Sequence, residues 1–159
     1  MTPCTIQRAG DEDLEALTLL FDAYRQFYDQ PSDTALARRF LAKRLGKHES
    51  VIWLAFDAAQ KPQGFCQIYP SFCSLLAQPV GILYDLFVAA SARRMGLARA
   101  LLLNAQAHAS AQGWARLDLS TACSNAPAQA LYTSLGWQRD TVFWTYSLAI
   151  PANATQERG

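Results

Sequence analysis

The segment that most constrains the fold of this chain lies between residues 81 and 120. Residues 81–88 (GILYDLFV) have the apolar, β-rich composition of a buried strand, and residues 116–120 (RLDLS) form a second extended segment. Between them, residues 97–111 are rich in leucine and alanine, which predicts a buried helix. Two neighbouring strands joined by a helical crossover must run parallel. The chain is therefore expected to contain a parallel β-α-β unit.

The rest of the chain adds an antiparallel half and further helices. Residues 51–56 (VIWLAF) and 65–69 are extended, and the turn residues between them predict a hairpin. The other expected elements are strands at 5–8 and 141–150 and helices at 14–28, 34–46 and 126–135. The resulting order, β-α-α-β-β-β-α-β-α-β, predicts an α/β fold around a mixed, partly antiparallel sheet.

Length and charge exclude several classes of protein and of partner. With 159 residues, the chain is expected to form one domain over residues 1–150, followed by a polar, frayed tail at 151–159. A net charge of +1 without a basic run argues against nucleic acid or an anionic membrane surface as a partner. No stretch approaches the roughly 20 apolar residues of a membrane helix, so a cytoplasmic location is expected. The four cysteines form no C-x-x-C pair and lie far from histidine, so no metal site is expected.

The turn from Arg93 to Ala98 lies between the strand at 81–88 and the helix at 97–111. A helix N-terminus leaves its first amide N–H groups without intrahelical partners and carries partial positive charge, which favours an anion such as pyrophosphate. Gly96 allows close approach of the backbone, and Arg93, Arg94 and Arg99 add positive charge. A plain surface turn capped by arginines is an equally good interpretation of these six residues alone.

A second candidate site lies on the helix at 126–135. Asn125, Ala128 and Tyr132 are spaced i, i+3, i+7 and therefore share one face of the helix. Each residue also has an ordinary structural explanation, since Asn125 is a good N-cap and Tyr132 is a suitable core aromatic residue.

Taken together, the two segments resemble the GCN5-related N-acetyltransferase (GNAT) superfamily. Arg93, Gly96 and Ala98 match its (Gln/Arg)-x-x-Gly-x-(Gly/Ala) signature, and residues 125–137 (NAPAQALYTSLGW) match its N-x-x-A-x-x-L-Y-x-x-x-G-(F/W) region. The resemblance implies a sheet that splays apart between its fourth and fifth strands to hold acetyl-CoA. The cofactor-binding residues that it implies are Leu86, Phe87, Val88, Arg93, Arg94, Met95, Gly96, Leu97, Ala98, Arg99, Asn125, Ala128 and Tyr132.

The resemblance also implies a mechanism in which the acceptor amine attacks the thioester directly in a ternary complex. Tyr132 would lie near the thioester sulfur and donate a hydrogen bond to the leaving thiolate. Polyamine acetyltransferases resemble this chain before the turn but carry Glu-Asp-(Leu/Phe), where this chain has Tyr84-Asp85-Leu86. Strand alternation predicts Tyr84 on the face of Leu86 and Val88, with Asp85 on the opposite face. Asp85 is a candidate base, and a purely structural hydrogen bond is the alternative.

The acceptor is expected to be a primary amine of a small molecule or a peptide, held near the first two helices. The candidate residues are Tyr24, Phe27, Tyr28, Asp29 and Asp33, because aromatic rings with acids bind cations; helix packing is the alternative. The resemblance implies a homodimer to which residues 142–150 contribute. A non-catalytic acyl-CoA sensor would keep the turn without needing Tyr132. A nucleotide-binding domain is disfavoured, because neither G-x-x-x-x-G-K-(S/T) nor G-x-G-x-x-G occurs.

Overall fold

The computed structural model describes residues 5–151, which divide into two compact units. The first unit ends at Ser120 and contains a five-stranded sheet, whereas the second begins at Thr121 and contains one helix. The single domain expected over residues 1–150 stays a prediction, and residues 152–159 of the expected tail lie outside the described part of the chain. No helix among the described residues is long and apolar enough to cross a membrane.

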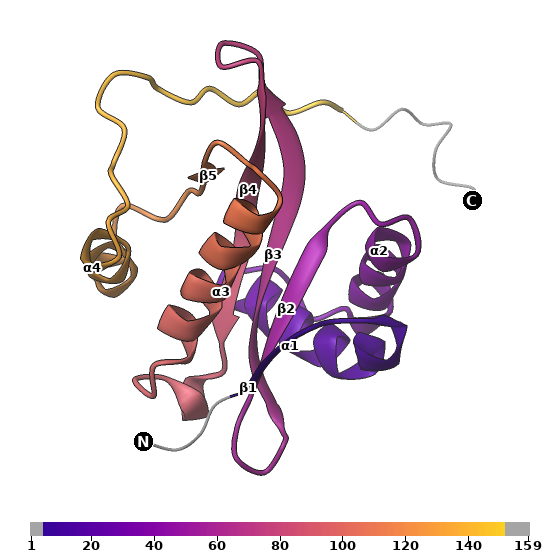
Figure 1. Cartoon of the computed structure of the whole chain (residues 1–159). Helices are drawn as coiled ribbons and strands as arrows, with labels where there is room; N and C mark the ends of the chain where they lie inside the picture. Colours follow the sequence, from indigo (N-terminus) through magenta and orange to yellow (C-terminus); the bar gives the residue numbers. More distant parts are fainter. Residues whose placement is uncertain (1–4, 152–159) are drawn as a thin grey trace. The chain divides into compact units, whose positions relative to one another are not determined.

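The first unit confirms the predicted α/β class and the mixed sheet (Figure 1). Strands follow one another in the order β1-β2-β3-β4-β5; the first four pair antiparallel, and β4 pairs parallel to β5. The elements are β1 (Thr5–Arg8), η1 (Asp11–Asp13), α1 (Leu14–Phe27), α2 (Thr34–Gly46), β2 (Val51–Phe56), β3 (Pro62–Cys73), β4 (Gln78–Val88), η2 (Ala90–Ala92), α3 (Leu97–Ala111) and β5 (Leu117–Asp118).

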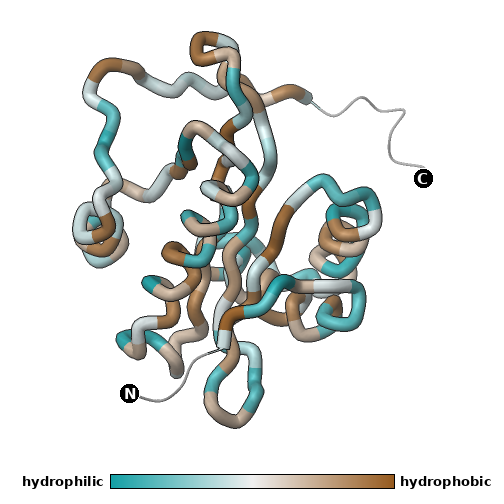
Figure 2. Tube along the Cα trace, viewed as in Figure 1, coloured by the Kyte–Doolittle hydropathy of each residue, from teal (hydrophilic) through white to brown (hydrophobic). Residues whose placement is uncertain are grey.

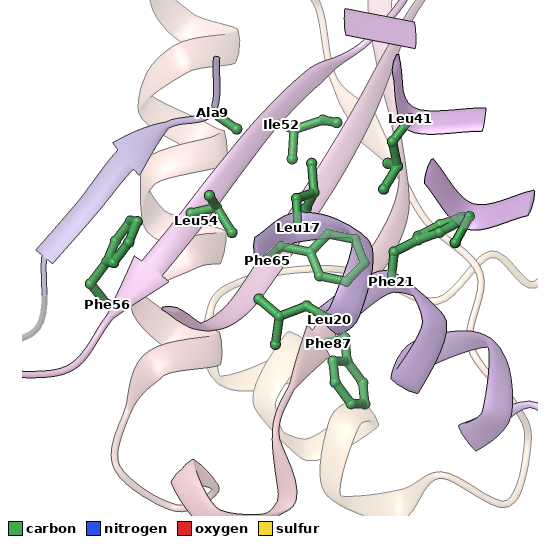
Figure 3. Packing of buried hydrophobic residues seen from close by; sticks show 11 residues of the cluster. Ala9, Leu17, Leu20, Phe21, Leu41, Ile52, Leu54, Phe56, Phe65 and Phe87 are labelled. Carbon is green, nitrogen blue, oxygen red and sulfur yellow. The ribbon is translucent and has the colours of Figure 1, made fainter. Parts of the chain in front are cut away.

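Helices cover both faces of this sheet. Leu17 and Phe21 of α1 pack with Phe65 of β3 and Phe87 of β4 in the main hydrophobic cluster, which Figure 3 shows. Trp53 lies on the other face, since its ring is 5.8 Å from that of His108 in α3. Hydrophobic and hydrophilic residues are mixed along α1, α2 and α3, as expected for helices with one buried side (Figure 2).

The parallel pair β4–β5 is short, which opens the sheet as the resemblance implied. Only Gly81 and Ile82 of β4 have partners in β5, namely Leu117 and Asp118. Beyond this point, β4 continues to Val88 without a parallel neighbour in the first unit. Within the first unit, one edge of the second half of β4 therefore has no neighbouring strand.

A β-bulge interrupts the pairing of β3 with β4. Gln67 lies opposite Asp85 and Ile68 lies opposite Leu83, so Tyr84 is an extra residue without a partner. The bulge invalidates the simple alternation predicted for this strand. The ring of Tyr84 lies 5.6 Å from that of Tyr69, which shares its face of β3 with Gln67, so Tyr84 lies on the same side as Asp85.

The second unit contains α4 (Ala126–Ser134), which confirms the predicted helix to within one residue. The strand predicted at residues 141–150 is wrong, because this segment has no regular secondary structure. Apolar alternation favours an extended chain, but a strand also needs a neighbour for its main-chain groups. Within the described residues this segment pairs with no strand, and Val142, Trp144 and Ile150 are exposed.

Candidate functional site

The main-chain amides of the turn between β4 and α3 form the first part of the candidate site. Of the residues that the structure describes, none offers a main-chain carbonyl to the N–H groups of residues 94–98. The helix hydrogen bonds begin only with Ala100, whose N–H donates to the carbonyl of Gly96 at 3.0 Å. Five consecutive amides at the positive end of a 15-residue helix are an arrangement suited to an anion.

Two left-handed residues shape this turn. Arg94 has a φ of 65° and Gly96 a φ of 82°, which turns successive N–H groups toward one side. A Cβ atom built on Gly96 would meet no heavy atom within 4 Å, so the space in front of this residue is open. The positive φ therefore favours glycine at this position, whereas packing within the described protein does not require it.

The arginines of the turn have different surroundings. The guanidinium Nε of Arg93 donates to the carbonyl oxygen of Val88 at 3.3 Å, and its Cζ lies 5.4 Å from the ring centroid of Phe27. Arg94 and Arg99 are exposed, whereas the side chain of Leu97 is buried against the sheet. Leu97 can therefore offer a ligand only its main chain, while Arg94 and Arg99 place positive charge at the surface beside the turn.

The end of β4 supplies main-chain groups and one buried ring. Leu86 and Val88 are half-buried, and they lie opposite Cys66 and Gly64 of β3. The ring of Phe87 belongs to the core, 6.2 Å from Tyr24. Of the three residues predicted here, Phe87 can thus contribute to a cofactor site only through its main chain.

Asp85 lies at the centre of a buried hydrogen-bond network. This residue is only 4% exposed, and its Oδ2 accepts a hydrogen bond from Nε2 of Gln67 at 2.6 Å. The Tyr24 hydroxyl donates a second hydrogen bond to this carboxylate. Burial raises the pKa of Asp85, and the two hydrogen bonds oppose that rise. A carboxyl group with a raised pKa is suited to accept and release protons near neutral pH.

Three tyrosines lie around this carboxylate. Burial, followed by the charge of Asp85, raises the pKa of Tyr24, and the same causes raise the pKa of Tyr69 to about 12. Both hydroxyls therefore stay protonated at neutral pH. Tyr84, which stands where the similar polyamine acetyltransferases carry a glutamate, is 66% exposed. The structure thus brings Tyr24, Tyr84 and Asp85 together.

The joint between α1 and α2 depends on a residue that the sequence analysis missed. Asp22 is buried, and its carboxylate accepts hydrogen bonds from the Ser32 hydroxyl at 2.7 Å and the Asp33 N–H at 2.8 Å. These bonds lower its pKa. An aspartate on the apolar side of a helix is the signal in the sequence that could have identified it.

The residues of this joint that were predicted to bind the acceptor amine fall into two groups. Asp33 caps α2 by accepting from the Leu36 N–H at 2.9 Å, so it has a structural task. Phe27, Tyr28 and Asp29 are exposed, and Tyr28 is 5.2 Å from the ring of Tyr24. The exposed rings are therefore contiguous with the half-buried Tyr24 and, through it, with Asp85.

In the second unit, the candidates on α4 keep the predicted spacing. Asn125 caps this helix, and its Oδ1 accepts from the Ala128 N–H at 3.3 Å. Tyr132 is half-buried, with its ring 6.0 Å from that of Trp137. Asn125 therefore has the structural role of an N-cap, as one of the two interpretations predicted. This role uses its Oδ1 as an acceptor, while its side-chain amide nitrogen is a donor.

Comparison with known proteins identifies the family. Residues 15–137 match the model of the acetyltransferase (GNAT) family. The chain belongs to this family. It is 41% identical over 147 residues to an uncharacterized N-acetyltransferase, YhfO, of Bacillus subtilis (strain 168), covering 92% of this chain and 98% of the relative. This acetyltransferase is therefore an enzyme of the class predicted from its sequence.

Solved structures agree with this membership. A crystal structure of a probable acetyltransferase is 42% identical, with a TM-score of 0.87 over 94% of this chain and 99% of the other. An aminoglycoside N-acetyltransferase in complex with CoA shares the fold at 18% identity, with a TM-score of 0.76 over 94% and 97% of the two chains. The GNAT family uses acetyl-CoA as its acetyl donor.

Proposed function

We propose that this acetyltransferase transfers the acetyl group of acetyl-CoA to a primary amine of a small molecule, by direct attack in a ternary complex. The observation that carries the proposal is the row of five main-chain amides at the start of α3, residues 94–98, for which the described part of the chain offers no main-chain acceptor. This row is suited to the pyrophosphate of CoA, and Arg94 and Arg99 add charge at its edge.

The rest of the cofactor follows from the open edge of β4. The pantetheine arm would bond to main-chain groups of Leu86 and Val88, as an added strand does, because β5 pairs with β4 only at Gly81 and Ile82. Asn125, Ala128 and Tyr132 of α4 would contribute further cofactor contacts, as the family motif implies. The binding residues proposed in the first unit therefore act largely through their main chain.

Transfer requires removal of a proton from the acceptor. An alkylamine with a pKa of about 10.4 is mostly protonated at pH 7, so a base must take its proton before the nitrogen attacks. Asp85 is the proposed base, because its carboxylate is buried and hydrogen-bonded among tyrosines. The amine nitrogen bonds to the thioester carbonyl carbon, and the carbon–sulfur bond then breaks. The Val88 N–H would polarise the carbonyl, and Tyr132 would donate a hydrogen bond to the departing thiolate.

The acceptor class follows from the surroundings of Asp85. The rings of Phe27 and Tyr28 are exposed beside Tyr24, and Asp29 is exposed next to them. Aromatic faces with nearby carboxylates favour a cationic amine over a neutral or anionic acceptor.

We further propose that the enzyme is a cytoplasmic homodimer. The thiols of Cys66, Cys73 and Cys123 are free, as is usual in a reducing compartment. Residues 142–150 carry exposed apolar side chains, among them Trp144 and Tyr146, and burial of such a segment favours association.

Two measurements test the proposed reaction. In thermal unfolding, acetyl-CoA should raise the melting temperature, whereas ATP and NAD should not. Release of free thiol should then depend on an added amine when a panel of primary amines, amino acids and peptides is supplied. Stabilisation by ATP or NAD alone would refute the proposal. Binding of acetyl-CoA without amine-dependent thiol release would instead favour a sensor.

A further inference from the structure

We infer that Gln67 is a positioning residue that holds Asp85 as the proton acceptor of the reaction. This inference rests on the proposed function, in which Asp85 is the base. Gln67 lies in the middle of β3, in a run of apolar residues (FCQIY), and is completely buried. A buried amide costs free energy unless both of its ends are hydrogen-bonded, so its presence there requires an explanation.

Both ends of the Gln67 amide have partners. Its Oε1 accepts a hydrogen bond from the Ser50 hydroxyl at 2.8 Å, and its Nε2 donates to Oδ2 of Asp85 at 2.6 Å. The carboxylate determines this orientation, because an inverted amide would place two oxygen acceptors against each other. Ser50 satisfies the far end of the amide, so the donor nitrogen stays directed at Asp85.

The sheet sets this contact through its register. Gln67 lies directly opposite Asp85, at the last regular pair before the bulge at Tyr84. Side chains directly opposite one another in an antiparallel pair are within reach of a hydrogen bond. Beyond this pair the bulge shifts the register, so Tyr84 has no partner in β3 and its side chain is exposed, while that of Asp85 is buried.

Gln67 has a specific electrostatic effect on its partner. Burial is the largest influence on the pKa of Asp85 and raises it, whereas the Gln67 hydrogen bond lowers it. A base must be ionised at the working pH before it can accept a proton. Gln67 therefore keeps the buried carboxylate ionised to a lower pH than burial alone would allow.

The test uses Gln67→Met, which keeps the length of the side chain but removes the donor. We expect the acidic limb of kcat/KM against pH to move to higher pH, with about a ten-fold loss on the acidic side and little change on the alkaline side. Gln63→Met is the matched control. Gln63 is also a buried glutamine of β3, but its Nε2 donates to Asp57 at 2.8 Å and not to Asp85. Its pH profile should keep the wild-type shape.

A second readout separates this inference from the proposed function. In ligand-free protein, the carboxyl carbon of Asp85 is titrated by NMR and assigned with Asp85→Asn. Gln67→Met should raise the pKa of Asp85 in this titration. If the titration moves but the rate profile does not, Gln67 tunes Asp85 as inferred and Asp85 is not the base. If the titration does not move, the inference is overturned. If Gln67→Met fails to fold, Ser50→Ala should produce a smaller shift in the same direction, and no shift would overturn the inference equally.

Discussion

Two proposed functional regions lie near the end of β4, namely the turn after Val88 and the surroundings of Asp85. They are built in different ways. At Val88 the strand leads into a turn in which the main-chain amides of residues 94–98 are the proposed ligand-binding groups. Three residues before Val88, Asp85 depends on side chains from α1 and β3 that meet only in the folded sheet. The first site is local and open, whereas the second is dispersed and buried. Side-chain substitutions should therefore affect the Asp85 site strongly and the amide turn weakly.

The largest effect is expected at Asp85. Asp85→Asn removes the proposed base while keeping a side chain of similar shape, so kcat/KM should fall by about 10²- to 10⁴-fold at neutral pH. Steady-state thiol release with the best amine from the panel measures this loss. Asp57→Asn, which changes a carboxylate in the turn between β2 and β3, is the control and should retain activity. Full activity of Asp85→Asn would mean that its network is structural.

Asp85→Asn is expected to lower activity but to raise the free energy of unfolding relative to wild type as the pH increases. Burial raises the pKa of Asp85, so its contribution to stability is present below about pH 4 and is lost as the pH rises through its folded-state pKa. Asp85→Asn should therefore become more stable relative to wild type as the pH is raised from 4 to 8. Urea unfolding at several pH values measures this trend, and a constant difference would contradict it.

The second largest effect is expected at Asp22, whose network is also buried but serves only the joint of α1 and α2. Asp22→Ala leaves the Ser32 hydroxyl and the Asp33 N–H without their acceptor, which should cost about 2–3 kcal/mol of unfolding free energy. Because the pKa of Asp22 is lowered, its contribution is present above the unfolded value of about 4 and is lost as the pH falls. Equal stability of the variant and the wild type at pH 7 would contradict this role.

A smaller effect is expected in the amide turn. Gly96→Ala adds a Cβ in the open space where the pyrophosphate is proposed to bind, so the affinity for acetyl-CoA should fall by about ten-fold. Gly113→Ala, at the other end of α3, is a matched control, because Gly113 also has a positive φ and open space in front of it. Both variants should lose about 1 kcal/mol of stability. Calorimetric titration should show weaker acetyl-CoA binding in Gly96→Ala alone; equal binding by the two would remove the turn from the cofactor site.

The smallest effect is expected at Tyr84. Its hydroxyl is on an exposed residue, so Tyr84→Phe should change kcat/KM by about three-fold or less. Tyr24→Phe removes a donor to the buried Asp85 and should change it more. Side-by-side pH profiles of the two variants measure this difference. A larger loss in Tyr84→Phe would make Tyr84, and not Asp85, the reacting group.

Local features of the fold were predictable from the sequence. Helices α2 and α3 begin and end where the pattern predicted, because capping residues and apolar spacing act within a few residues. The bulge at Tyr84 was not predictable, since it depends on how β3 and β4 align. The strand predicted at 141–150 failed for a related reason: its composition favours extension, but strand formation depends on a partner.

By itself, the sequence determined the family, the order of elements up to α4 and the amide turn that begins at Arg94. These are properties of short segments, in which a glycine, a helix start or a motif acts through its immediate neighbours. Only the tertiary structure decided that Asp85 is buried, that Gln67 and Tyr24 hydrogen-bond to it, and that Asp22 holds the helix joint. The partners in these contacts are up to 61 residues apart in the chain, as Tyr24 and Asp85 are, so they become neighbours only when the sheet and its helices pack together.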